Sequence, residues 1–235
     1  MTDLPVSRET GSVPPTATQV AGRRVGILSD FADLLATEGV TRGLIGPREV
    51  PRLWERHLVN CAVVAEAAPS GATVADVGSG AGLPGLVWAI CRPDLQLTLI
   101  EPLLRRVTFL HEAIARLQLT NVEVVRARAE DLHGRRRFPV VTSRAVAPLD
   151  RLSTWCLPLV ELGGRMVAMK GASAGEEIAA AVSCISRLGG APPTLIEHAA
   201  GANAPRTWAV HVVRLREGSA PTDRSSRRPK QSRRR

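Results

Sequence analysis

The stretch DVGSGAGLPG, residues 76 to 85, has the residue types and spacing best suited to chemistry in this sequence. It places one acid, Asp76, just ahead of four glycines. Glycines at a turn from a strand into a helix let the backbone approach a ligand closely and direct amide hydrogens toward its negative group. The stretch therefore predicts a loop that binds a small charged ligand.

A dinucleotide and S-adenosylmethionine compete for this loop. Gly80, Gly82 and Gly85 fit the dinucleotide pattern G-x-G-x-x-G, which makes a nicotinamide-dependent oxidoreductase a rival interpretation. In dinucleotide-binding folds the strand normally runs apolar into its first glycine, whereas here Asp76 stands two residues before Gly78. A carboxylate is unfavourable beside a pyrophosphate and favourable beside the ammonium and sulfonium groups of S-adenosylmethionine. We therefore expect S-adenosylmethionine to be held by Asp76 and by the loop at Gly78, Gly80 and Gly82.

Further positions extend this predicted cofactor site. Glu101 ends the next strand-like run, LTLIEP, where a carboxylate can accept hydrogen bonds from both ribose hydroxyls of either cofactor. The segment ARAED places Ala129 and Glu130 just past a third run, where they could fix an adenine ring. A solvated loop is the alternative for Ala129 and Glu130.

The glycine loop has to be positioned by an alternation of strands and helices that begins at Thr73. Short β-like runs stand at 73–77, 96–100, 122–126, 139–143, 164–169, 193–198 and 207–214. Amphipathic helical patterns stand at 84–91, 103–117, 148–160 and 175–188. The alternation predicts an α/β fold built around a parallel sheet, with seven strands in all. The last two runs have no helix between them, which predicts an antiparallel hairpin at the sheet edge.

Helical patterns also precede the glycine loop. One covers 24–38, and a second opens after Gly46-Pro47. We therefore expect a disordered N-terminus (1–20), an N-terminal helical cap (21–70), an α/β domain (71–216) and a basic disordered tail (217–235).

The charge of the chain is concentrated at its C-terminal end. The formal net charge is +9, and residues 224–235 hold seven basic residues and no acids, which leaves +2 for the rest. The tail is either a solubilising segment or an arm that neutralises RNA phosphates.

Membrane and metal chemistry are not indicated. No apolar run approaches the roughly 20 residues that cross a bilayer, and no charged and apolar leader is present, so we expect a cytoplasmic protein with no membrane partner. The four cysteines show no C-x-x-C pair, so free thiols and no bound metal are expected.

The motifs DVGSGAGLPG, IEPLLRRVTFL, SRA at 143–145 and MKG at 169–171, in this order, resemble the RsmG (GidB) family of bacterial rRNA methyltransferases. WERHLVN at 54–60 is similar to the Arg-His helix of that family, although the family's aspartate after Arg-His-hydrophobic-Leu is absent, the corresponding stretch being HLVN. The resemblance covers about residues 25 to 215. It implies a Rossmann-like class I S-adenosylmethionine-dependent methyltransferase fold. The implied reaction is methylation of N7 of a guanine in 16S rRNA, guanine 527 in the 530 loop, with 16S rRNA or the small ribosomal subunit as partner and a monomeric enzyme.

The resemblance also implies individual site residues. By position in the family motifs, the cofactor contacts are Gly78, Leu83, Ala129, Glu130 and Arg144. Arg56 and His57 are the implied RNA contacts of the helical cap, with a packed or surface histidine as the alternative for His57. The basic run Arg135, Arg136 and Arg137 is a further candidate for phosphate contacts, or it is simply solvated.

The residue types agree with methylation of a ring nitrogen. Guanine N7 has a free in-plane lone pair, so no base is needed and orientation does most of the work. The fourth predicted strand ends in SRAVAP, not in the D/N-P-P-aromatic motif expected for exocyclic amines, and no Pro-Cys nucleophile is present. Arg144 and Lys170 end adjacent strands and are expected to be catalytic, holding guanine O6 or flanking phosphates. Structural salt bridges are the alternative, as is an RNA-binding protein that has kept the fold without catalysis.

Overall fold

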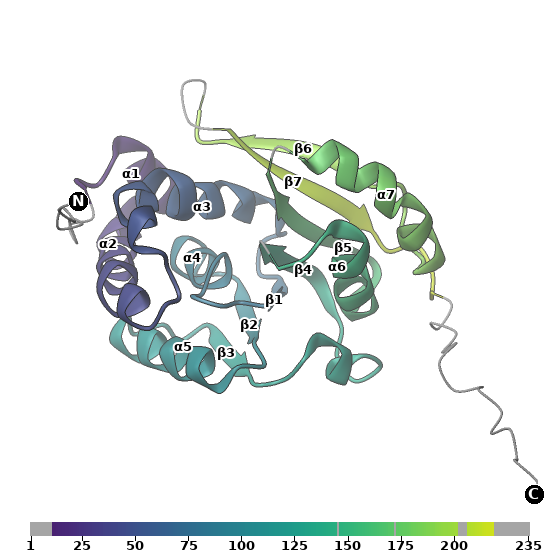
Figure 1. Ribbon diagram of the computed structural model, residues 1–235, viewed down its shortest axis with the longest axis horizontal. Helices are drawn as coiled ribbons and strands as arrows, with labels where there is room; N and C mark the ends of the chain where they lie inside the picture. Colours follow the sequence, from purple (N-terminus) through teal and green to yellow (C-terminus); the bar gives the residue numbers. More distant parts are fainter. Residues whose placement is uncertain (1–10, 145, 172, 202–205, 219–235) are drawn as a thin grey trace, which may run out of the picture.

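The computed structural model describes residues 11–144, 146–171, 173–201 and 206–218 (Figure 1). It confirms the predicted alternation of strands and helices. The strands are β1 (Thr73–Val77), β2 (Gln96–Ile100), β3 (Val122–Val125), β4 (Phe138–Arg144), β5 (Val160–Lys170), β6 (Thr194–Ala199) and β7 (Arg206–Val213). The α-helices are α1 (Pro15–Ala21), α2 (Val25–Leu34), α3 (Asn60–Val64), α4 (Gly85–Cys91), α5 (Leu104–Arg116), α6 (Leu149–Cys156) and α7 (Ala174–Arg187).

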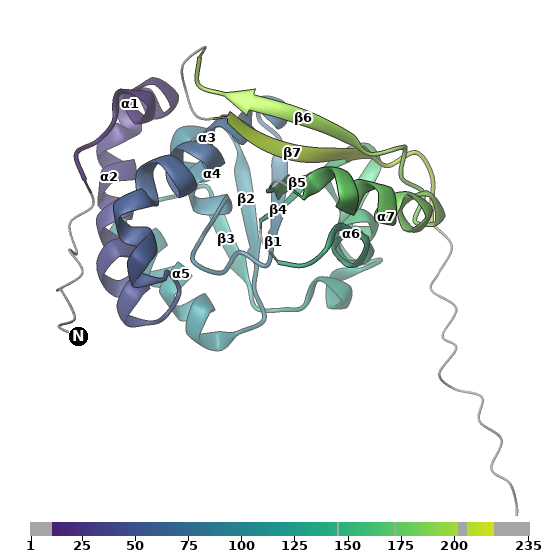
Figure 2. The same cartoon turned by 45° about the horizontal axis from the view of Figure 1, so that its top comes forward.

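The strands form one seven-stranded sheet in the order β3-β2-β1-β4-β5-β7-β6. The first five pair in parallel, whereas β7 runs antiparallel to both β5 and β6. The hairpin predicted for the end of the chain therefore forms, with β6 as its edge strand (Figure 2). Strand β5 begins at Val160 rather than at 164, because a register shift between Phe138 and Val140 of β4 accommodates the polar, glycine-containing start of β5.

Helices cover both faces of the sheet, and each face has its own apolar core. The N-terminal helices pack with α4 and α5 on one face, while α6 and α7 cover the other (Figures 1 and 2). Trp88 of α4 is fully buried, and its indole Nε1 donates a hydrogen bond to the Cys61 carbonyl of α3 over 2.8 Å. This bond ties the helical cap to the first helix of the α/β unit. None of the described helices is long and apolar enough to cross a membrane.

The start of the described chain differs from the prediction of a disordered segment over 1–20. Pro15–Ala21 form α1, and Ala17 is completely buried against the cap. Pro15 stands at the first helical position, where its missing N–H removes no intrahelical bond. The Pro/Thr-containing composition concealed this helix because its apolar side chains are small. Residues 1–10, and residues 219–235 of the predicted basic tail, lie outside the described residues.

The second predicted helical pattern is realised in successive helical turns. These are η3 (Pro47–Arg52), η4 (Leu53–Val59) and α3. They bring the WERHLVN segment over the sheet edge where the parallel strands end. The residues that follow β1 and β2 and the last residues of β4 and β5 meet at this same edge, since parallel strands share one direction.

Candidate functional site

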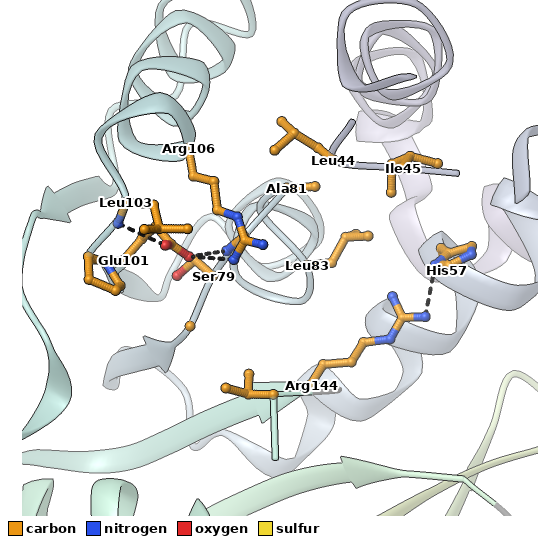
Figure 3. Close-up of a pocket in the computed structure, with 14 residues that line it drawn as sticks. Leu44, Ile45, His57, Ser79, Ala81, Leu83, Glu101, Leu103, Arg106 and Arg144 are labelled. Atoms are coloured by element: carbon orange, nitrogen blue, oxygen red, sulfur yellow. Dashed lines mark hydrogen bonds and ion pairs between the residues drawn. The ribbon is translucent and has the colours of Figure 1, made fainter. Parts of the chain in front are cut away.

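A cavity of about 560 Å³ lies at the carboxyl ends of the parallel strands (Figure 3). We call it the main cavity. Its lining residues are Leu44, Ile45, His57, Gly78, Ser79, Gly80, Ala81, Leu83, Glu101, Pro102, Leu103, Arg106, Arg144 and Val146. The predicted cofactor residues Gly78, Gly80, Leu83, Glu101 and Arg144 are therefore brought together. Asp76 and Gly82 do not line this cavity.

The glycine loop has a shape that its sequence makes obligatory. Gly82 adopts a φ of +87°, and a Cβ there would collide with the Leu86 side chain. At the start of α4, the amide of Gly85 donates to Asp76 Oδ2 over 3.0 Å, and a Cβ at Gly85 would lie 2.6 Å from that oxygen. Gly82 and Gly85 thus pack on the side of the loop that faces the protein interior, whereas Gly78 and Gly80 line the cavity.

Asp76 lies beneath the loop rather than on the cavity surface, which differs from the predicted contact with an ammonium group. It is fully buried, and burial raises the pKa of its carboxyl to about 7. Its Oδ1 has no hydrogen-bond partner in the described part of the chain. The alternation of side chains along β1 turns Asp76 into the α4 side of the sheet, and the sequence pattern did not resolve this depth.

Glu101 is the acid that does reach the main cavity. Its Oε2 accepts a hydrogen bond from the Gly80 amide at 3.0 Å, and its Oε1 accepts one from the Leu103 amide at 3.0 Å. Arg106 Nη1 lies 3.4 Å from Oε2 (Figure 3). The sequence patterns did not point to Arg106, because only the phase of α5 shows which arginine of LLRR faces the carboxylate. Glu101 thus joins the loop after β1 to the start of α5.

A smaller cavity of about 270 Å³ adjoins the main one and contains the other predicted cofactor residues. We call it the side cavity. It is lined by Val77, Gly78, Ile100, Pro102, Leu103, Ala127, Arg128, Ala129, Glu130, Val146, Arg151 and Trp155. Ala129 and Glu130 begin a short helical turn, η6 (Ala129–Leu132). Apolar residues make up most of this lining, which suits an adenine ring, and Arg128, Glu130 and Arg151 add charged groups to it.

The residues of both cavities fit S-adenosylmethionine. A Cβ on Gly78 would lie 2.8 Å from a methyl group of Val146, so only glycine keeps the passage between loop and side cavity open. Glu101 supplies a buried carboxylate for ribose hydroxyls at the point where the two cavities meet. Open α/β sheets bind nucleotides at this edge.

Arg144 ends β4 and is held from the helical cap. Its Nη2 donates to the Arg56 carbonyl over 3.1 Å and to His57 Nδ1 over 2.8 Å (Figure 3). Its Nη1 lies 3.6 Å from Cys61 Sγ. Burial raises the pKa of the Cys61 thiol to about 11, so this cysteine is a neutral packing partner and no nucleophile.

His57 is neutral and fixed in one tautomer. Arginine can only donate, so Nδ1 of His57 accepts and its Nε2–H donates to Glu49 Oε2 over 2.8 Å. Burial and the charge of Arg144 lower the pKa of His57, against the raising effect of Glu49. The hydrogen bond from His57 lowers the pKa of Glu49, so Glu49 is ionised. No sequence pattern pointed to Glu49, which the turn η3 brings to His57.

We expect the His57→Ala variant to lose about tenfold in methyl transfer, since one of the charge-assisted hydrogen bonds that orient Arg144 is removed. In the parent protein, transfer should fall as the pH drops through the lowered pKa of His57, because an imidazolium cannot accept from Arg144. The variant should lack this acidic limb. Initial rates measured from pH 5 to pH 8 check the prediction, with Glu49→Gln as the control that keeps an acceptor for His57 Nε2–H; identical profiles for parent and His57→Ala would contradict it.

A third cavity of about 720 Å³ lies behind Arg144, at the ends of β4 and β5 and the start of β7. We call it the rear cavity. Its lining residues are Arg56, Asn60, Arg144, Val146, Ala147, Pro148, Met169, Lys170, Gly171, Glu177 and Thr207. Arg144 and Val146 are shared with the main cavity. Arg56, one of the two predicted RNA contacts from the cap, is exposed at its rim.

Lys170 forms a salt bridge, which was the alternative to its predicted contact with guanine O6 or a phosphate. Its side chain is only 7% exposed, and its Nζ donates to Glu177 Oε2 and to the Ala147 carbonyl, both over 2.7 Å. Burial raises the pKa of Glu177, but Lys170 and other donors outweigh it and the pKa lies below its ordinary value. Glu177 also accepts from the Leu149 amide, at the start of α6, over 2.9 Å. Through these contacts Lys170 stabilises the segment that follows β4, and its ammonium group is not directed at a nucleobase.

The basic run Arg135, Arg136 and Arg137 lies at the opposite edge of the sheet, because it precedes β4 whereas Arg144 ends it. Seven strand residues at about 3.3 Å each separate Arg137 from Arg144 by roughly 20 Å. Arg136 pairs with Glu123 over 2.9 Å, and Arg137 pairs with Glu217 over 2.7 Å. The predicted phosphate contact by this run is therefore remote from the cavities, and two of its three charges are already paired.

Known structures share this fold. A SAM-dependent methyltransferase from Aquifex aeolicus superimposes with a TM-score of 0.54 at 17% identity, over 74% of this chain and 98% of that one. A SAM-dependent O-methyltransferase from Thermotoga maritima gives a TM-score of 0.53 at 12% identity, over 80% of this chain and 72% of that one. These similarities establish the Rossmann-like methyltransferase fold of the sheet and its helices.

Sequence relatives are much closer. Ribosomal RNA small subunit methyltransferase G of Nocardioides sp. is 59% identical over 214 residues, which is 91% of this chain and 85% of that protein. The protein of the same name from Streptomyces coelicolor is 52% identical over 212 residues, 89% of this chain and 87% of that protein. The family model described as rRNA small subunit methyltransferase G (GidB) matches residues 24–198. The chain therefore belongs to the rRNA small subunit methyltransferase G family, a family of S-adenosylmethionine-dependent methyltransferases.

Proposed function

We propose that this protein transfers the methyl group of S-adenosylmethionine to N7 of a guanine in 16S rRNA, in the 530 loop that the sequence resemblance implies. The observation that carries the proposal is the position of Arg144, which borders both the main and the rear cavity. One guanidinium thus stands between a cavity that fits the cofactor and a second cavity large enough for a base. The names of the sequence relatives support small-subunit rRNA as the substrate.

The rear cavity suits a methyl acceptor atom that carries no proton to be removed. Among the described residues that line it, Glu177 is the one acid, and it is engaged by Lys170 and by the Leu149 amide. His57 borders only the main cavity, and both of its ring nitrogens have partners. An exocyclic amine would need a base to take its proton, whereas N7 attacks through a free lone pair. The absence of a free base in this lining therefore supports N7 over an amine.

S-adenosylmethionine, when bound, supplies a methyl group on a positively charged sulfur. The backbone of the 78–83 loop and the carboxylate of Glu101 would hold the cofactor, and the side cavity would take its adenine ring. The chemistry supplied would be transfer of the sulfonium methyl group to the N7 lone pair, which would leave a neutral thioether and place the positive charge on the guanine ring. Arg144 and the cap residues that hold it orient the base, and Asp76 acts from beneath the loop by shaping it.

We further propose that the enzyme works in the cytoplasm, where its ribosomal substrate is made, and as a monomer. Arg56 is the exposed cation that we assign to the RNA at the rim of the rear cavity.

Transfer of labelled methyl from S-adenosylmethionine to unmodified small subunits tests the function directly. We expect label in the RNA and not in ribosomal protein, at N7 of one guanine. Label on another atom or in protein would overturn the proposed acceptor. Comparing the affinities for S-adenosylmethionine and for a nicotinamide dinucleotide distinguishes a methyltransferase from an oxidoreductase. Repeated methyl transfer by one enzyme molecule distinguishes the methyltransferase from a protein that binds RNA without catalysis.

Deleting residues 224–235 should weaken RNA binding and flatten its salt dependence. The deletion removes seven basic residues, and for each phosphate that is no longer neutralised the slope of log K against log salt falls by about 0.7 on single strands. Affinity for S-adenosylmethionine should not change. Filter binding between about 50 and 300 mM salt measures the slope. Deleting residues 1–10, which hold one arginine and two acids, is the matched control; an equal slope in all three proteins would favour a solubilising tail.

A further inference from the structure

Two residues that line the rear cavity each carry a side-chain oxygen that has no hydrogen-bond partner in the described chain. Asn60 Oδ1 and Thr207 Oγ1 are both buried and have no hydrogen-bond partner, and both residues line this cavity. Buried polar atoms are nearly always paired, because an unpaired one has lost water without gaining a partner. Two such atoms from α3 and β7 on one cavity indicate a site built for a ligand that donates hydrogen bonds.

Asn60 and Arg144 stand side by side. Asn60 Nδ2 and Arg144 Nη2 donate to the same acceptor, the Arg56 carbonyl, each over 3.1 Å. The Nδ2 assignment of the amide follows from that carbonyl, so the oxygen of Asn60 is the free end. Nε of Arg144 donates to no acceptor in the described chain. An acceptor, Asn60 Oδ1, therefore neighbours a donor, Arg144.

Guanine carries the complementary pair on neighbouring atoms. Its O6 accepts, and the adjacent N1–H donates, whereas adenine has a donor at N6 and an acceptor at N1. O6 and N7 are also neighbours along the same edge of the purine. A base whose O6 meets Arg144 therefore directs N7 toward the main cavity, which Arg144 also borders, and directs N1–H toward Asn60, which lines only the rear cavity.

We propose that Asn60 and Thr207 are the residues that select guanine, a deepening that rests on the proposed function. Asn60 Oδ1 accepts from N1–H after a short side-chain rotation, Arg144 donates to O6, and Thr207 Oγ1 accepts from the exocyclic N2 amine. The two orphaned oxygens are thereby satisfied only by a base with donors at N1 and N2. Adenine would leave Asn60 unpaired and place its own amine against Arg144.

Two matched pairs of variants test this selection in the full chain. Thr207→Val removes the hydroxyl at nearly equal volume, and Thr207→Ser keeps it. Asn60→Leu removes the amide, and Asn60→Gln keeps both the amide oxygen and the nitrogen that donates to the Arg56 carbonyl. We expect Thr207→Val and Asn60→Leu to lose about tenfold or more in kcat/KM for small subunits, with the Kd of S-adenosylmethionine unchanged within about twofold. Thr207→Ser should retain most of the activity, and Asn60→Gln should retain more of it than Asn60→Leu.

Small subunits reconstituted with inosine at the target position supply the readout that a purely structural role would not move. Inosine keeps O6 and N1–H and lacks only the N2 amine. The parent protein should prefer guanine over inosine by about tenfold, and Thr207→Val should lose that preference. Equal use of both bases by the parent protein, or unchanged activity of both Thr207→Val and Asn60→Leu, would overturn the selection while the proposed function stands. No transfer by the parent protein to guanine N7 would overturn the proposed function and the selection together.

Discussion

Replacing Arg144 with alanine should reduce methyl transfer by about a hundredfold or more while the protein stays folded. Removing a single preorganised donor at a reacting centre typically costs a factor of roughly 10²–10³. Arg144 is more than a donor here, because it borders the main and rear cavities and is held by the Arg56 carbonyl and by His57. Its loss leaves the acceptor base without a fixed orientation relative to the methyl group. Single-turnover rates on small subunits, together with the melting temperature, measure the effect.

Two control variants sharpen this prediction. Arg144→Lys keeps the charge, but one ammonium group cannot reach His57 Nδ1 and a base through separate arms, so we expect most of the loss to remain. Arg135→Ala removes an exposed arginine at the opposite edge of the sheet and should leave the rate within about twofold. Transfer by Arg144→Ala at the parental rate would refute the role assigned to this residue, and an equal loss in Arg135→Ala would point to nonspecific charge.

Replacing Glu101 with glutamine should raise the Kd of S-adenosylmethionine by roughly tenfold to a hundredfold. A hydrogen bond to a charged group contributes about 1.5–3 kcal/mol, and each factor of ten in Kd corresponds to about 1.4 kcal/mol. The carboxylate of Glu101 is 1% exposed and already accepts from the amides of Gly80 and Leu103. Glutamine would turn its amide NH2 group, a donor, toward one of these two donors, so both the loop contact and the ribose contact would weaken.

Calorimetric titration checks the effect of the Glu101 change. S-adenosylhomocysteine should lose affinity by the same factor, since it carries the same ribose and lacks only the methyl group and the sulfonium charge. Glu161→Gln is the matched control, because Glu161 is exposed at the start of β5, lines none of the three cavities and should shift the Kd by less than about threefold. An unchanged Kd in Glu101→Gln would show that this carboxylate serves only the protein fold.

The strand and helix pattern was readable from the sequence because each element has a period that one buried face enforces. All the predicted strand runs became strands, and the hairpin formed where the sequence placed no helix between the last two runs. Parallel strands carry their carboxyl ends to one edge, so the positions of Gly78, Glu101 and Arg144 after β1, after β2 and at the end of β4 were enough to predict their meeting. The cofactor site follows from local sequence and this one rule of topology.

The features that the sequence left unresolved or mispredicted depend on contacts between distant segments. Pro15–Ala21 is a helix because Ala17 is buried by segments distant in sequence, and no local pattern of small side chains signals that burial. Asp76 lies under its loop because β1 turns it toward α4. Lys170 pairs with Glu177 across two elements, and this contact depends on how α7 packs.

The sequence by itself determined the order of elements, the glycine loop, the carboxylate after β2 and the arginine that ends β4, because these depend on local periodicity and on spacing along the chain. Only the tertiary structure decided which charges are free. Ion pairs such as Lys170 with Glu177, the chain of hydrogen bonds from Glu49 through His57 to Arg144, and the unpaired oxygens of Asn60 and Thr207 depend on side chains from separate elements. The distances between these side chains are set by the packing of the elements, so the sequence of a single segment does not predict them.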